Sequence, residues 1–158
     1  MPAATPDKRE AILERVSAIC LTVPGFSSSV RNRGLRSNEQ RPACVLLDGD
    51  ESSKLVHDTR NKGRAGAMTP QIMIMRPELF VLLPEKRPTN VDVGQDLNEK
   101  RIALIAAIAE DASLAALLGS NGGVVYNGCV TDLKSGSAAT GQMRLDFAYT
   151  YTFIPTTA

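Results

Sequence analysis

The stretch MRLDFAYTYTF at residues 143–153 alternates apolar and polar side chains for eleven residues, and it constrains the fold more than any other part of the chain. Successive side chains of a strand point to opposite faces, so this pattern predicts an antiparallel strand with one face in the core and one in water. The predicted core face carries Met143, Leu145, Phe147, Tyr149, Tyr151 and Phe153. The predicted wet face carries Arg144, Asp146, Ala148, Thr150 and Thr152.

Three further segments have strand character. The run PACVLLD at 42–48 is apolar and of strand length, and the segment 70–83 contains a second such run. Pro77 is expected to interrupt the hydrogen-bond ladder, so the second strand should lie at an edge or end near Arg76. The segment VVYNGCVTDL at 124–133 is also strand-like, and its Asn-Gly pair predicts a turn at Asn127-Gly128.

Two segments have helical periodicity. In the first, Thr5 is the predicted N-cap, Pro6 takes the first helical position, and apolar residues recur every three or four positions until Pro24-Gly25. The second is rich in alanine and is expected from about Asp96 to Leu118, with a possible break at residues 111–113 into a long helix and a final turn.

The order α-β-β-α-β-β predicts an α+β fold, in which two main helices pack on one face of a mainly antiparallel sheet of about four strands. With 158 residues, 43% of them apolar, the chain has the size and composition of one globular domain, expected over residues 1–158. The net charge of +1 gives no overall attraction to nucleic acid or to acidic membranes. The start of the chain lacks a signal-peptide pattern and no apolar run has membrane-spanning length, so we expect a protein that is made in a cytoplasm and stays soluble.

The three cysteines, Cys20, Cys44 and Cys129, are widely spaced and are expected as buried free thiols. His57 is the only histidine and the cysteines have no zinc-ligand spacing, so no metal and no cofactor are expected.

The sequence VLLDGDE at 45–51 places three carboxylates around a glycine. Asp48 and Asp50 have the spacing of a haloacid-dehalogenase-like phosphatase, in which an aspartate nucleophile is followed two residues later by an acid-base aspartate and Mg²⁺ balances the phosphate charge. A suitable later lysine, a second acidic pair after a strand and a parallel sheet are missing from the pattern. We therefore expect hydrated carboxylates at a turn formed by Gly49, followed by a long charged loop at 49–69. A Mg-dependent phosphoryl-transfer enzyme using Asp48 and Asp50 remains the alternative.

Basic residues cluster in two polar segments. Residues 26–41 are expected to form a solvated loop or an edge strand, and the tip of the 49–69 loop is basic as well. The candidate contacts to another subunit or to an anionic partner surface are Arg31, Arg33, Arg36, Arg60, Lys62 and Arg64.

Six sequence segments, taken in order, are distributed over nearly the whole chain: REAILERVSAI, SVRNR, RPACVLLDGDE, MTPQIMIM, LAALLGSNGGVVYNGCVTDL and GQMRLDFAYTYTF. In this order and wording the sequence resembles the tail terminator, or tail completion, proteins of long-tailed bacteriophages. None of these segments is a catalytic signature.

The resemblance implies a non-enzymatic virion protein with helices packed on a mainly antiparallel sheet. It implies a homohexameric ring that caps the tail tube, stops its polymerisation and joins the tail to the head connector. The implied partners are the chain itself, the tail tube protein and the connector protein, with possible passage of genomic DNA through the ring and no membrane. The implied location is the tail-neck junction of the virion, after assembly in the bacterial cytoplasm. A head-to-tail neck adaptor and a cellular adaptor domain of the same fold are further alternatives.

Overall fold

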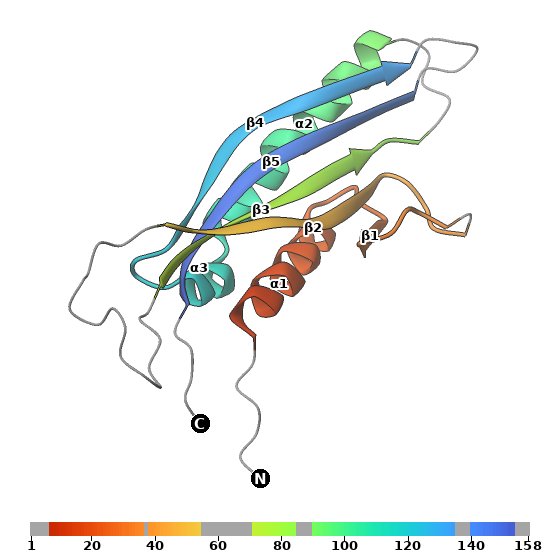
Figure 1. Ribbon diagram of the computed structural model, residues 1–158. Coiled ribbons are helices and arrows are strands. Elements are labelled where there is room, and N and C mark those ends of the chain that lie inside the picture. Colours follow the sequence, from red (N-terminus) through yellow and green to blue (C-terminus); the bar gives the residue numbers. More distant parts are fainter. Residues whose placement is uncertain (1–6, 37, 55–70, 85–89, 135–139, 154–158) are drawn as a thin grey trace, which may run out of the picture.

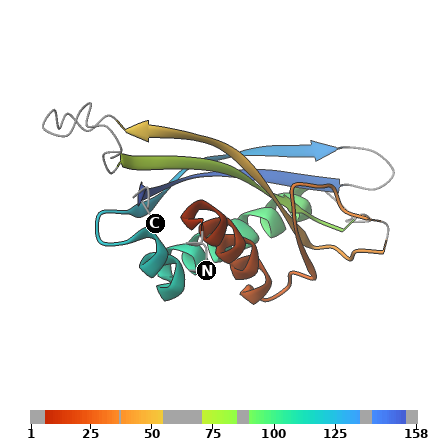
Figure 2. The ribbon, with the colours of Figure 1, turned by 60° about the horizontal axis from the view of Figure 1, so that its bottom comes forward.

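The computed structural model describes residues 7–36, 38–54, 71–84, 90–134 and 140–153 (Figure 1). They form an α+β fold in which three helices lie on one face of a five-stranded mixed sheet (Figure 2). The helices are α1 (Lys8–Thr22), α2 (Asn90–Glu110) and α3 (Ala112–Leu118). The strands are β1 (Ser28–Arg31), β2 (Ala43–Lys54), β3 (Gln71–Leu82), β4 (Gly123–Lys134) and β5 (Thr140–Phe153).

The strands lie in the order β1-β2-β3-β5-β4. Three of the four neighbouring pairs are antiparallel, as expected, whereas β1 pairs with β2 in parallel. The expected count of about four strands misses β1, because only four residues of the polar segment 26–41 join the sheet. The alternative of an edge strand in that segment is confirmed.

The alternation in β5 is confirmed as the centre of the core. Met143, Leu145, Phe147, Tyr149 and Tyr151 are each no more than 3% exposed. Phe153 is 38% exposed, so the buried part of the predicted core face ends at Tyr151.

The first helix begins later than predicted. Asp7, and not Thr5, is the N-cap: its carboxylate accepts a hydrogen bond from the Arg9 backbone N–H at 2.9 Å, and the helix begins at Lys8. Thr5 and Pro6 lie outside the described residues. Val23 caps the C-terminus, so the helix ends before Pro24 as predicted.

The second helix begins at Asn90 instead of about Asp96. Val93 and Leu97 are both fully buried and are one helical turn apart, so the residues before the predicted start add a core-facing turn. The predicted break is confirmed. Asp111 has extended backbone angles and caps α3 by accepting a hydrogen bond from the Leu114 N–H at 2.8 Å.

Pro77 lies inside β3, which runs between β2 and β5 in the middle of the sheet, so the prediction of an edge strand or an early end is wrong. The sheet accommodates the proline by local irregularity. On the β2 side the register shifts between Leu47 and Asp50, around Gly49 with φ +65°. On the β5 side, Cα pairing resumes at Glu78 after Met75. Because the backbone ladder is already irregular here, the missing N–H of Pro77 costs little stability.

The Asn127-Gly128 pair is not a hairpin turn, because β4 continues through it to Lys134. The register against β5 shifts between Tyr126 and Gly128, and Gly128 has φ +127°, so the pair forms a bulge. Tyr126 pairs with Phe147, which is level with Pro77 in the β3–β5 register. The irregularities at Gly49, Pro77 and Gly128 therefore line up across the sheet.

Candidate functional site

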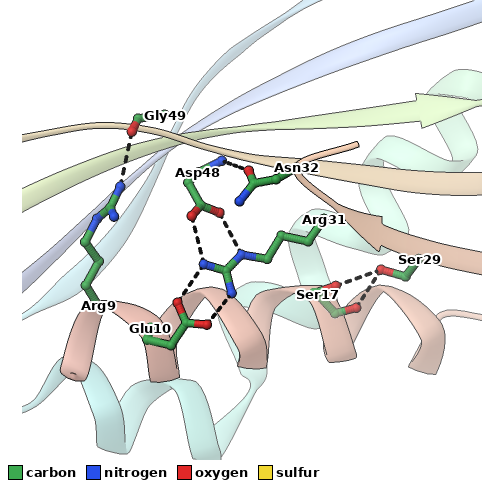
Figure 3. Close-up of polar contacts among 8 residues, drawn as sticks. All are labelled: Arg9, Glu10, Ser17, Ser29, Arg31, Asn32, Asp48 and Gly49. Carbon is green, nitrogen blue, oxygen red and sulfur yellow. Dashed lines mark hydrogen bonds and ion pairs between the residues drawn. The ribbon is translucent and has the colours of Figure 1, made fainter. Parts of the chain in front are cut away.

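The densest polar cluster joins α1, β1 and β2 through the guanidinium of Arg31 (Figure 3). Its Nε and Nη2 donate to the two carboxylate oxygens of Asp48 at 2.7 and 2.8 Å. Its Nη1 and Nη2 donate to the two oxygens of Glu10 at 2.7 Å each. One arginine therefore binds two carboxylates in forked geometry, which is the strong form of the ion pair.

These hydrogen bonds determine the charge state of the cluster. The Arg31 guanidinium lowers the pKa of the Asp48 carboxyl, with partial burial acting against it, and it also lowers the pKa of Glu10. The two carboxylates in turn raise the pKa of Arg31. At neutral pH all three groups are charged, and the cluster fastens the start of α1 to two neighbouring strands.

The carboxylates around Gly49 do not converge on one point. Asp48 is bound to Arg31, Glu51 accepts a hydrogen bond from the Tyr151 hydroxyl, and the side chain of Asp50 is exposed. Within the described residues, His, Cys, Asp and Glu side chains form no group of three that could hold a metal ion.

The expected turn at Gly49 is a bulge, and β2 continues as far as Lys54. The expected loop at 49–69 therefore starts too early, and its part beyond Lys54 lies outside the described residues. Polar side chains after an apolar run are typical of the end of a strand, but here the backbone of residues 50–54 stays paired with β3.

The arginines predicted as contact residues have different environments. Arg31 is engaged within its own chain. Arg33 donates to Glu39 at 2.9 Å, and the Arg36 backbone N–H donates to the same carboxylate at 2.8 Å. These contacts lower the pKa of Glu39 to about 2. The Arg36 side chain is exposed. Arg60, Lys62 and Arg64 lie outside the described residues, so a contact role for the six basic residues stays a prediction.

Sequence reasoning missed the link between Arg31, Glu10 and Asp48. It expected Asp48 as a hydrated carboxylate at a turn, whereas both carboxylate oxygens accept hydrogen bonds from Arg31 of the same chain. The available signal was weak: an arginine in a short polar segment, an acidic residue in a first helical turn and an acidic residue after an apolar run. Arg31 lies near Asp48 because β1 pairs in parallel with β2, and Glu10 joins them because α1 packs against β1.

A shallow hollow lies between α2, α3 and the start of β4. Its lining is mostly apolar and includes Ile108, Leu114, Leu118 and Val124. Asp111 is the only titratable residue in that lining, and its carboxylate already binds Arg15 and the Leu114 N–H. The hollow therefore offers no free charged group for a ligand.

The sheet face opposite the helices carries no described element (Figure 2). Val125 and Val130 of β4 are 58% and 52% exposed. Apolar side chains left uncovered on a sheet are typical material for a contact with another protein.

Comparison of the chain with protein-family models found no match, and comparison with curated proteins found none either. In the part of the chain that the structure describes, no helix is long and apolar enough to cross a membrane.

Proposed function

We propose that the chain is a non-enzymatic structural subunit of a phage tail. In this proposal it forms a ring that caps the end of the tail tube, stops tube polymerisation and joins the tail to the head connector. The sequence resemblance suggests this role. The structural observation that supports it is the unequal covering of the sheet: the described helices all lie on one face, whereas on the other face the long edge strand β4 leaves Val125 and Val130 exposed.

The polar chemistry of the described residues also favours assembly over catalysis. Both oxygens of Asp48 accept hydrogen bonds from Arg31, so a phosphate or Mg²⁺ would have to displace an ion pair before it could use this carboxylate. A nucleophile in a phosphoryl-transfer site needs an open approach and a neighbouring cation-binding group. The phosphoryl-transfer alternative therefore has no described feature that favours it.

The proposed partners are other copies of the chain, the tail tube protein and the connector protein. The ring of six, the location at the tail-neck junction and the passage of genomic DNA through the ring come from the resemblance alone. A neck adaptor would share the same covered and uncovered surfaces. The two roles differ in their binding partner, because a terminator must bind the growing end of a tail tube.

The test combines mass measurement and tube binding. Light scattering and negative-stain imaging, with and without tail tubes, are expected to show a six-membered ring and its attachment to tube ends. When the protein is added to polymerising tube protein, far less than one copy per tube subunit should be enough to limit tube length. A strict monomer that also leaves tube length unchanged would contradict the proposal. Binding to connectors but not to tubes would indicate the neck adaptor.

A separate measurement addresses the enzyme alternative. Turnover of p-nitrophenyl phosphate with Mg²⁺ is expected to stay at the level of the buffer blank. Mg²⁺-dependent turnover that Asp48→Asn abolishes and an exposed-site control, Asp132→Asn, retains would establish phosphoryl transfer instead.

A further inference from the structure

The two edges of the sheet are very different. β4 is a twelve-residue edge strand whose described backbone pairing goes only to β5. The opposite edge is β1, which has four residues and pairs with Ala43–Leu46 of β2. Half of the N–H and C=O groups of an edge strand point away from the sheet, so a long edge such as β4 is a template for another strand.

The two edge strands run in opposite directions. β1 is parallel to β2, and the steps from β2 to β3, from β3 to β5 and from β5 to β4 are each antiparallel. A second copy placed beside β4 in the same orientation would therefore present its β1 in antiparallel direction. That is the geometry in which neighbouring strands pair most readily.

The registers also place the two edges at the same level. One row of paired residues runs from Ser28 through Ala43, Leu82 and Gln142 to Asp132. A parallel row runs from Arg31 through Leu46, Leu79 and Leu145 to Cys129. The four residues of β1 therefore lie level with residues 129–132 of β4.

The side chains that would meet are compatible. With the sheet continued at constant register, Asp132, Thr131 and Val130 would lie opposite Ser28, Ser29 and Val30 of the next copy. This gives a carboxylate opposite a hydroxyl, two hydroxyls together, and two β-branched apolar side chains together, and pairs of these kinds stabilise sheets. Val130, which is 52% exposed in the single chain, would gain an apolar neighbour.

We propose that β4 of one copy pairs with β1 of the next copy, head to tail, so that the sheet continues from subunit to subunit. The occupant is a second copy because the matching direction, level and side chains all belong to this chain. The contact joins two different surfaces, which is the kind that closes a ring. In assigning this contact to ring closure, the inference rests on the proposed function.

The test uses single-cysteine variants in a Cys129→Ser background, in which the remaining cysteines, Cys20 and Cys44, are fully buried. Ser28→Cys and Asp132→Cys proteins are mixed and treated with a short bis-maleimide. A cross-linked dimer is expected in the mixture, and none with either variant alone. A chain that carries both changes should give a ladder of oligomers that ends at the closed ring.

The control pair is Val125→Cys mixed with Val130→Cys, which would face each other if two β4 strands paired about a two-fold axis centred between Asn127 and Gly128. Cross-linking of that pair but not of Ser28→Cys with Asp132→Cys would overturn the proposal. A six-membered ring without the Ser28–Asp132 cross-link would also overturn it while leaving the proposed function intact. The expected ladder in a protein that does not bind tail tubes would support the contact and contradict the function. A protein that stays monomeric with and without tail tubes, gives neither cross-link and leaves tube length unchanged would contradict both.

Discussion

The guanidinium of Arg15 in α1 donates two hydrogen bonds, at 2.9 and 2.6 Å, to the carboxylate of Asp111, a residue 96 positions away. The same carboxylate accepts the Leu114 N–H and so caps α3. The Asp111 side chain therefore lies at the break between α2 and α3, caps α3 and joins this break to α1 through Arg15.

Replacing Asp111 by alanine is expected to lower the free energy of unfolding by about 1–2 kcal/mol, because loss of an N-cap carboxylate has this cost. Urea unfolding followed by circular dichroism measures it. Asp111→Ser keeps a capping hydroxyl and loses the ion pair, so it should fall between the parent and the alanine variant. Equal stability of the parent and the alanine variant would show that the cap is unimportant.

Gly49→Ala is expected to destabilise the fold by roughly 3 kcal/mol, through left-handed backbone strain and overpacking. Gly49 has φ +65°, and an added Cβ would overlap the backbone carbonyl of Arg76 in β3. Gly34→Ala is the matched control, because nothing lies within 4 Å of its Cβ position. Similar unfolding midpoints for the two variants would contradict the assigned role of the bulge.

Acid should weaken the fold through the carboxylates held by arginines. The folded-state pKa values of Asp48, Glu10 and Glu39 lie below their usual values of 3.8, 4.5 and 4.5, and that of Glu39 falls to about 2. At pH values between the folded-state and unfolded-state pKa of these carboxyls, the unfolded chain binds more protons than the folded chain. The free energy of unfolding therefore rises with pH in this range. The stabilisation is complete above about pH 5 and is lost as the pH falls through the folded-state values.

Unfolding measured from pH 7 to pH 2 should therefore show a decline that begins near pH 5. Glu39→Gln is expected to make the decline shallower. A Glu39→Gln curve parallel to that of the parent would contradict the lowered pKa.

Thiol labelling is expected to separate one cysteine from the other two. Cys129 is exposed, which corrects the expectation that all three thiols are buried, whereas Cys20 and Cys44 are fully buried. The neighbouring Cys20 thiol and burial both raise the pKa of Cys44, which makes it less reactive still. Ellman's reagent should titrate one thiol at once in the native protein and three in denaturant. Cys129→Ser should remove the fast phase, and a second fast thiol would contradict the buried positions.

Much of the fold follows from side-chain periodicity. The alternation from Met143 to Tyr151 and the break at Asp111 could be read directly, because both depend on residues close in sequence. The errors at Pro77 and Asn127-Gly128 have one physical source. Both are strong turn or breaker signals in isolation, and in each case a bulge in the sheet provides the backbone geometry that the local sequence demands.

The candidate site was less predictable than the fold. Asp48 looked like a catalytic or hydrated carboxylate, because the position of its partner Arg31 depends on β1, a strand too short for its pattern to be recognised. The level match between Ser28 and Asp132 likewise depends on four strand registers in succession, none of which periodicity fixes.

The line of irregularities through Gly49, Pro77 and Gly128 divides the sheet into two panels, each with its own ladder of backbone hydrogen bonds. This line is a crease in the sense that backbone pairing between neighbouring strands is shifted or interrupted along it. Amide hydrogen exchange should reveal the division, with protected amides in both panels and faster exchange along the crease between them.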